Sequence, residues 1–453
     1  MKRPALVAVF GFVTLASGCS DGGTGAAPES ANAGSAGATA AGSAGATSSG
    51  GTQAGQGGSA NAGETSISGA AGAAGTSAGG TTGSACAQGT TLASGGLEFE
   101  CGASSQVFES SGRPDNRVNY VILGDGYVAS ELDGAYLDHI ANVLEGDGGM
   151  FSELGEPYVR YRKFINICAL KVASNESGVD GPGGDPARDT AFGGGNIGDR
   201  LGGVDEGLVQ AAIAELMPDH VDVDWVAVSL NVDEWWNSGG QLMVWSGAHM
   251  QTDALATASV ALHEGGHAFH GLADEYVDPN LSCAPDEEPP EVNVTADSSG
   301  SKWAHWLGFD HNPGSGLQGA FEGGRYCATG IWRPSQDSEM NILPQAFNMP
   351  SIEKIVRDIY EIVDPIDSHT DDSAPLTNPA KLELRLIDPA VLKVEWSVDG
   401  VVVTADGGEC FDTALLGPGE HSVQARAYDD TPWVDPADRA ALEQSVTWTL
   451  TIE

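Results

Sequence analysis

A short segment near the middle of the chain carries residue types that bind a metal ion and move a proton. Residues His263 to His267 read His-Glu-Gly-Gly-His, which is a His-Glu-x-x-His motif. On a helix, side chains four residues apart lie on the same face, so both histidines can bind one ion. Neutral imidazole suits Zn²⁺, which at a catalytic site takes three protein ligands and keeps one position for water. The motif therefore predicts a zinc site on a helix.

Glu264 follows the first histidine, where a carboxylate can take a proton from a water activated by the metal and later pass it to a leaving amine. The alternative is that the two histidines are ordinary buried side chains. Gly265 and Gly266 argue against it, because each costs a helix interior about 1 kcal/mol relative to alanine. Two glycines make more sense where other atoms approach the helix closely or where the site needs space. We interpret Glu264 as the general base and acid.

A third metal ligand must come from outside this motif. Gly271 can turn the chain out of the helix, and Asp274 follows three residues later. Glu275 is the main rival for this role. His270 shares the helical face of the two histidines but lies too far along the axis, and a distant residue stays open as a choice. Asp274 could also orient His267 by a hydrogen bond instead of binding the metal.

Hydrophobic patterning predicts the elements that position this motif. Three apolar, β-branched runs are typical of strands: Arg117–Leu123, Phe164–Val172 and Trp225–Val232. Four segments have helical spacing of apolar residues: Ser130–Leu144, Val204–Leu216, about Ala254–Phe269 and Ser351–Ile362. The Gly- and Asp-rich stretch from Gly178 to Gly203 is expected to be a long loop. Strands that alternate with helices indicate an α/β or α+β domain.

The C-terminal part has a different pattern. A polar acidic run predicts a linker over residues 366–378. Short strand-like runs follow it: Lys381–Ile387, Leu392–Val398, Val401–Thr404, Ser422–Tyr428 and Ser445–Ile452. This pattern favours a small all-β sandwich over residues 379–453, immunoglobulin-like in outline. It contains no catalytic constellation, so we expect a stabilising or adhesive accessory domain.

Residues His263 to Tyr276 read His-Glu-Gly-Gly-His-Ala-Phe-His-Gly-Leu-Ala-Asp-Glu-Tyr, and this segment resembles the signature of the IgA-peptidase family of metzincin-like zinc metallopeptidases. Other segments resemble landmarks of that family in the same order: Ile122–Tyr127, Asn175–Asp180, Asn237–Gly240, Phe321–Gly324, Ile331–Ser335, Ser338–Asn341 and Phe347–Ser351. The resemblance covers residues 115–365. It implies a zinc metallopeptidase domain of mixed α/β class over that range.

The resemblance also implies roles for single residues. Metzincins end the helix with a glycine and place the third ligand three residues later, which corresponds to Asp274, although this chain has one extra residue before Gly271. They also place a methionine beneath the metal. Met340 is our candidate, and the alternative is a core methionine, a description that Met349 fits equally. Relatives often have Tyr-Gly-Gly where this chain has Asn237-Ser-Gly-Gly, so substrate preference is open.

The N-terminus predicts export from a bacterial cell. Lys2 and Arg3 precede an apolar run over Ala5–Leu15, which is typical of a signal peptide and too short to span a bilayer. Small residues directly before Cys19 resemble a lipobox. We therefore expect residues 1–19 to be a lipoprotein signal peptide with Cys19 lipidated. The alternative is ordinary cleavage nearby that discards Cys19.

Composition separates a spacer from a folded part. Residues 20–85 consist almost entirely of Gly, Ala, Ser and Thr, which predicts a disordered tether between the lipid anchor and an N-terminal extension over residues 86–114. The chain has 63 acidic and 20 basic residues. Such a charge argues against nucleic-acid binding, which needs clustered Lys and Arg. We expect a cell-surface or outer-membrane lipoprotein that contacts the membrane through its anchor only.

Six cysteines remain after Cys19: Cys86, Cys101, Cys168, Cys283, Cys327 and Cys410. An even number in an exported chain predicts disulfides, and we expect Cys86 to pair with Cys101 and Cys283 with Cys327. A Ca²⁺ site is a weaker option for Asp278–Glu291, because EF-hand spacing is missing and an acidic solvated loop is favoured.

Two hypotheses follow. The first is a surface-tethered zinc endopeptidase that acts on a protein or peptide substrate. The second is a non-catalytic binding lipoprotein with a structural or degenerate metal site. The presence of Glu264 favours the first, because a structural metal site has no use for a base at that position.

Overall fold

The structure is a computed structural model that describes residues 86, 92, 98–404 and 407–453. The predicted signal peptide, the lipidation of Cys19 and the tether over residues 20–85 lie outside the described residues. The chain divides into two units, Met1–Ala78 and Gly79–Glu453, and the second contains every described residue. Within that described part, no helix has both the length and the apolar character needed to cross a membrane.

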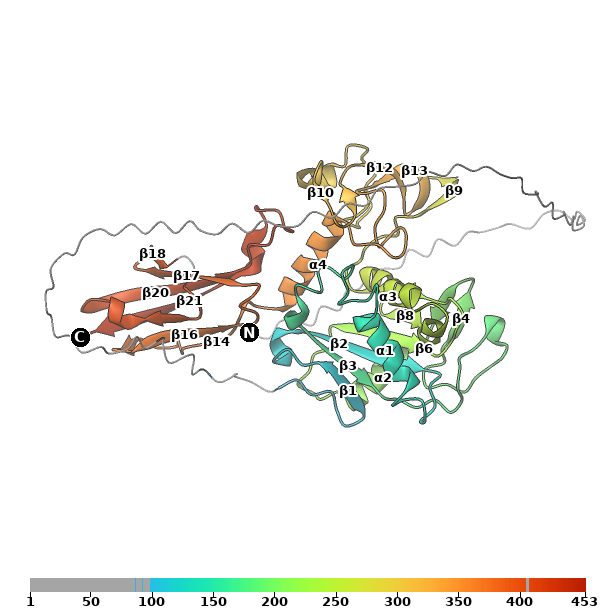
Figure 1. The fold of residues 1–453 in the computed structure, drawn as a ribbon, viewed down its shortest axis with the longest axis horizontal. Helices are drawn as coiled ribbons and strands as arrows, with labels where there is room; N and C mark the ends of the chain where they lie inside the picture. Colours follow the sequence, from blue (N-terminus) through green and yellow to red (C-terminus); the bar gives the residue numbers. More distant parts are fainter. Residues whose placement is uncertain (1–85, 87–91, 93–97, 405–406) are drawn as a thin grey trace, which may run out of the picture. The chain divides into compact units, whose positions relative to one another are not determined.

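A six-stranded sheet forms the centre of the first folded part (Figure 1), with the strand order β1-β3-β2-β6-β8-β7. The strands are β1 (Ser105–Glu109), β2 (Val118–Asp125), β3 (Ile165–Leu170), β6 (Trp225–Leu230), β7 (Ser238–Gly239) and β8 (Met243–Ser246). The four inner strands are parallel, and β1 and β7 are antiparallel edges. All residues of β2 and β3 are buried, as expected for parallel strands covered on both faces.

Helices cover both faces of this sheet. Tyr120 and Ile122 of β2 share a core with α1 (Ala135–Glu145) and α3 (Ala254–Ala268). Val121 and Leu123 of the same strand share a second core with α2 (Glu206–Leu216). Since successive side chains of a strand point to opposite faces, α1 and α3 lie on one face and α2 on the other. The mixed α/β class predicted for this part is confirmed.

Short strands that the sequence did not predict surround the sheet. The stretch expected to be a loop up to Gly203 contains a hairpin of β4 (Gly195–Gly198) and β5 (Leu201–Gly203). After α3, a three-stranded sheet has the order β12-β13-β9. Its strands are β9 (Val277–Ser282), β12 (Phe321–Gly324) and β13 (Tyr326–Arg333), and a small hairpin joins β10 (Asp310–His311) to β11 (Gly316–Leu317). The prediction of an acidic loop from Asp278 onward is therefore wrong over β9.

Helix α4 (Met349–Ile362) leads to two further sheets, ordered β14-β16-β19 and β15-β21-β20-β17-β18. Their strands are β14 (Ile366–His369), β15 (Leu376–Thr377), β16 (Lys381–Leu386), β17 (Lys393–Val398), β18 (Val401–Thr404), β19 (Cys410–Asp412), β20 (Gly419–Tyr428) and β21 (Glu443–Ile452). Leu382 of one sheet and Trp396 and Trp448 of the other belong to one apolar core. The segment expected to be a linker contains β14 and β15, which pair with β16 and β21.

Three disulfides join distant parts of the chain. Cys283 pairs with Cys327, as expected. The expected pairing of Cys86 with Cys101 is wrong, because Cys86 pairs with Cys410 and Cys101 with Cys168. Strand β1 follows Cys101 closely and pairs antiparallel with β3, which carries Cys168. This strand pairing brings the Cα atoms of Cys101 and Cys168 to 6.2 Å. Our prediction paired cysteines that are close in sequence, so it missed a disulfide that depends on strand pairing.

Candidate metal centre

Helix α3 presents both histidines of the motif on one face. The side chain of Asp253 caps the first turn by accepting from the Ala256 N–H. One helical turn separates His263 from His267, and their Nε2 atoms lie 3.2 Å apart. Both rings are held by a hydrogen bond from Nδ1 to a backbone carbonyl, that of Glu339 at 2.9 Å and that of Leu272 at 2.7 Å. Because a carbonyl only accepts, Nδ1 carries the proton and the Nε2 lone pair is free to bind a cation.

The chain turns back at Gly271 and delivers a carboxylate to these two nitrogen atoms. Gly271 has φ of 62°, a left-handed conformation that favours glycine. Three residues later, Asp274 Oδ1 lies 3.1 Å from His263 Nε2 and 3.2 Å from His267 Nε2. Among the residues that the structure describes, only these three form a group with metal-ligand chemistry, and their ligand atoms all lie within 4.8 Å of one another.

The electrostatics of the group favour a positive charge at its centre. Burial alone would raise the pKa of Asp274, but the two imidazole rings that lie against its carboxylate hold that pKa well below its ordinary value. Burial alone would lower the pKa of His267, whereas the carboxylate of Asp274 raises it to about 9. The carboxylate thus stabilises a cation at the histidine nitrogens, which is the charge that a divalent metal supplies.

The two alternative ligands are engaged elsewhere. Glu275 is fully buried and accepts hydrogen bonds from Ser338 Oγ at 2.6 Å, Asn348 Nδ2 at 2.7 Å and Asn293 Nδ2 at 2.9 Å. These bonds use both carboxylate oxygens of Glu275 to join its segment to those of Asn293, Ser338 and Asn348. His270 bonds to Tyr158 through Nε2 and to Asp358 through Nδ1. Neither residue joins the group of His263, His267 and Asp274.

Glu264 lies beside this group in a largely dry environment. Its side chain is buried, and burial raises its pKa, while His263, His267 and Arg200 act in the opposite direction. Gly239 of the edge strand β7 lies against it. A Cβ atom at position 239 would approach Glu264 Oε2 to 3.1 Å and the Glu264 carbonyl oxygen to 2.6 Å. Gly239 belongs to the Asn-Ser-Gly-Gly segment noted in the sequence, and β7 can lie this close to Glu264 only because residue 239 has no side chain.

Met340 lies against the helix between the two histidines. It is fully buried, and a Cβ atom at Gly266 would stand 2.7 Å from its sulfur. A Cβ atom at Gly265 would stand 2.7 Å from the Trp225 ring. The close approaches predicted from the two glycines are confirmed. Met349, which the sequence suggested could be a core methionine, is buried at the start of α4.

Sequence reasoning missed Tyr326, whose hydroxyl donates to Asp274 Oδ2 at 2.5 Å. It also missed Arg200, which bonds to the hydroxyl of Tyr276 at 2.8 Å. Both lie outside the motif, 52 and 74 positions from Asp274 in the numbering. The only signal for Tyr326 was its place two residues after the Phe321–Gly324 landmark.

Part of the chain that includes the candidate metal ligands matches a known protein family. The family model described as IgA Peptidase M64 matches residues 107–315. The matched range contains His263, Glu264, His267 and Asp274 and ends before Tyr326 and Met340. A comparison with curated proteins gives no match.

Proposed function

Because residues 107–315 belong to the IgA peptidase M64 family, we propose that this protein is a zinc-dependent endopeptidase. Membership in a peptidase family implies a protein or peptide substrate. The observation that supports a zinc-dependent mechanism is the group of two imidazole nitrogens and one carboxylate oxygen with a buried glutamate beside it. That set of donors is typical of a catalytic zinc site, where three protein ligands leave a position open.

The residues fit a zinc ion. Both Nδ1 atoms are bonded to carbonyl oxygens, so both Nε2 atoms present lone pairs, and Asp274 Oδ1 lies beside them. Zinc bound by these three residues would lower the pKa of a water molecule and polarise the scissile carbonyl group. Met340 packs against the helix between the two histidines and supports their spacing.

Glu264 is the residue that moves the proton. Its partly desolvated carboxylate accepts the proton of the attacking water and passes it to the leaving amine. Burial raises its pKa, which makes it a better base than an exposed glutamate. Gly239 keeps the neighbouring edge strand close without a side chain that would displace the carboxylate.

We also propose the wider organisation. Residues 115–365 form a metzincin-like catalytic domain, and residues 379–453 form an immunoglobulin-like sandwich. The exported chain is a bacterial cell-surface or outer-membrane lipoprotein that Cys19 anchors to the membrane. Residues 20–85 tether the enzyme to this anchor. Three disulfides within the second unit fit an oxidising compartment outside the cytoplasm.

The test uses the purified mature chain with casein and gelatin as substrates, with a proteome-wide cleavage profile to extend the range of substrates. We expect hydrolysis that a zinc chelator abolishes and that added zinc restores. Hydrolysis that is insensitive to the chelator would contradict a metal-dependent mechanism. A zinc-loaded chain that cleaves no protein in the profile would support a non-catalytic binding lipoprotein.

A further inference from the structure

The backbone of Arg325 and Tyr326 adopts an uncommon conformation beside the metal centre. Their φ angles are 51° and 65°, so two consecutive residues with side chains occupy the left-handed region. Strained backbone of this kind persists where neighbouring structure holds it, and it concentrates at functional sites. Here the Arg325 N–H donates to the Asp274 carbonyl at 2.7 Å, and the Tyr326 N–H donates to the Tyr276 carbonyl at 3.0 Å. The strained turn is thus tied directly to the segment that carries the third ligand.

This conformation brings the Tyr326 hydroxyl to the outer oxygen of Asp274. The hydroxyl donates to Oδ2 at 2.5 Å, whereas Oδ1 faces the two Nε2 atoms. A carboxylate held in this way presents one oxygen to a cation and cannot rotate to present both. Tyr326 itself is 45% exposed, so packing in a core does not account for its strained position.

A chain of hydrogen bonds fixes the direction in which Tyr326 donates. Arg200 Nη2 donates to the Tyr276 hydroxyl at 2.8 Å, and that hydroxyl lies 3.1 Å from the Tyr326 hydroxyl. A guanidinium group only donates hydrogen bonds, so the Tyr276 hydroxyl accepts from Arg200 and donates its own hydrogen to the Tyr326 hydroxyl. Tyr326 then directs its single proton to Asp274. The Arg200 guanidinium also lies over the Tyr276 ring, 5.3 Å from its centre, which holds both groups in place.

We propose that Tyr326 is a positioning residue for the metal, which holds Asp274 as a ligand through one oxygen and thereby tightens zinc binding. Tyr276 and Arg200 orient its hydroxyl. This inference rests on the proposed metal site but not on peptide hydrolysis. Residues that hydrogen-bond to metal ligands typically change metal affinity by about 10–100-fold when they are removed.

The test measures zinc affinity of the full chain by competition with a chromogenic chelator. Tyr326→Phe removes the hydroxyl and keeps the ring, and we expect zinc to bind about 10–100-fold more weakly. Tyr276→Phe removes only the orienting donor, and we expect a smaller loss in the same direction. Tyr428→Phe is the matched control, since it removes the hydroxyl of a partly exposed tyrosine on β20, far along the chain, and should leave zinc affinity unchanged.

The cobalt-substituted proteins give a second readout that a general loss of stability would not move. The visible absorption of bound Co²⁺ reports ligand geometry, so its bands should shift in Tyr326→Phe and stay unchanged in Tyr428→Phe. Wild-type zinc affinity and an unshifted cobalt spectrum in Tyr326→Phe would overturn this inference and leave the proposed function intact. Failure of the wild-type chain to bind zinc would instead overturn the proposed function. If Tyr326→Phe does not fold, an unchanged zinc affinity in Tyr276→Phe would overturn the inference.

Discussion

Each candidate metal ligand is held through the atom that faces away from the metal position. Carbonyl oxygens of Glu339 and Leu272 accept from the Nδ1 atoms of His263 and His267, and Tyr326 donates to the outer oxygen of Asp274. Three different segments supply these supports. Rotation of each ligand therefore breaks a hydrogen bond, so the site is arranged before a metal binds and loses little entropy on binding.

A half-buried aspartate directly before β6, Asp224, gives a prediction for pH dependence. Burial raises the pKa of Asp224 to about 7 from 3.8, although the Asn119 N–H donates to its carboxylate, and Asp222 raises it further. Between these two values the folded chain binds more protons than the unfolded chain at this residue, so its contribution to stability falls as pH rises.

The substitution Asp224→Asn keeps an oxygen that can accept from the Asn119 N–H and removes the charge. We expect it to increase the free energy of unfolding at pH 8 and to change it much less at pH 5, measured by urea denaturation. The exposed Asp219→Asn in the same loop is the control and should show no such difference. A larger gain at pH 5 than at pH 8 would contradict the assigned pKa.

The part of the site that lies within one helical turn was predictable from sequence. The spacing of His263, Glu264 and His267 fixes their common face without any knowledge of the fold. Asp274 and Glu275 are adjacent, and no local rule separates them. The difference arises because Asn293, Ser338 and Asn348 bind Glu275 in the folded chain. Tyr326 and Arg200 depend in the same way on tertiary structure.

The helices and strands that the sequence predicts well are long and have a regular pattern of apolar residues. The apolar runs of β2, β3 and β6 and the spacing in α2 and α3 were predicted within a few residues. The helix predicted from Ser130 begins at Ala135, because residues 129–134 form turns. The missed strands are short or rich in glycine. Strand β9 reads Val-Asp-Pro-Asn-Leu-Ser, is exposed throughout, and shows no alternation that would mark it.

Helix α3 contains two glycines that disfavour a helix but allow neighbouring side chains to contact its backbone. Gly265 and Gly266 reduce its intrinsic stability by about 1 kcal/mol each relative to alanine. They allow Trp225 of β6 and Met340 to reach the helix backbone at positions where a Cβ atom would stand 2.7 Å from a neighbour. The sequence revealed that something approaches this helix, and only the fold identified what does.

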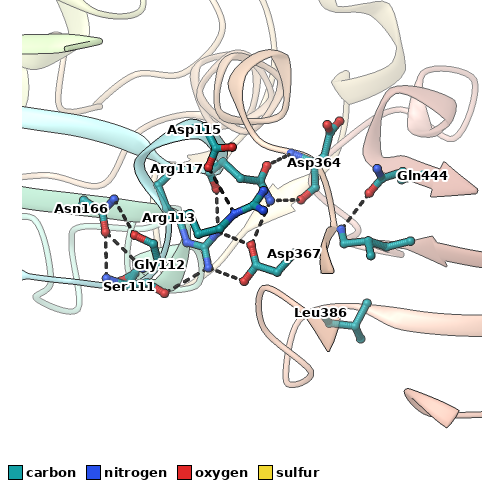
Figure 2. Close-up of polar contacts among 12 residues, drawn as sticks. Ser111, Gly112, Arg113, Asp115, Arg117, Asn166, Asp364, Asp367, Leu386 and Gln444 are labelled. Atoms are coloured by element: carbon teal, nitrogen blue, oxygen red, sulfur yellow. Dashed lines mark hydrogen bonds and ion pairs between the residues drawn. The ribbon is translucent and has the colours of Figure 1, made fainter. Parts of the chain in front are cut away.

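Within the second unit, the part built around the six-stranded sheet and the C-terminal sheets share one core. Apolar residues of the central sheet, of α4 and of both C-terminal sheets belong to a single cluster. Polar contacts join the same parts. Figure 2 shows Arg117, directly before β2, bonded through both terminal nitrogens to Asp367 of β14. Both nitrogen–oxygen distances are 2.7 Å. The sequence suggested a linker here because the run is polar and acidic, and it could not reveal that the partner of Asp367 lies 250 residues away.

Asp429 makes this shared core testable. It is 2% exposed and accepts from Arg160 Nη2 at 2.8 Å, the Tyr161 hydroxyl at 2.6 Å and the Tyr360 hydroxyl at 3.1 Å. Removing one partner of a fully buried ion pair costs about 3–5 kcal/mol, and the Arg160 side chain is 27% exposed, so water compensates part of its charge and the lower end of this range applies. Asp429→Asn should therefore lower the free energy of unfolding by about 3 kcal/mol.

Thermal unfolding of this variant, followed by tryptophan fluorescence and by zinc release, should show one shifted transition for both signals. Asp430→Asn is the matched control, because Asp430 pairs with Lys393 at the surface, where such pairs contribute about 0–1 kcal/mol. Zinc release at the wild-type temperature, while fluorescence reports earlier unfolding, would show that the C-terminal sheets unfold independently of the part built around the six-stranded sheet.

In the proposed mechanism, His263, His267 and Asp274 bind a catalytic zinc ion while Glu264 moves the proton. Its most direct test measures zinc content and peptide hydrolysis in the same preparation of Glu264→Gln, beside the wild-type chain. Glutamine preserves the shape of the side chain but is not a base, and general acid–base catalysis contributes about 10²–10⁴-fold. We predict one zinc ion per chain in both proteins and a loss of hydrolysis of at least about 100-fold in the variant. Wild-type hydrolysis by the zinc-loaded variant would show that Glu264 is not the residue that moves the proton.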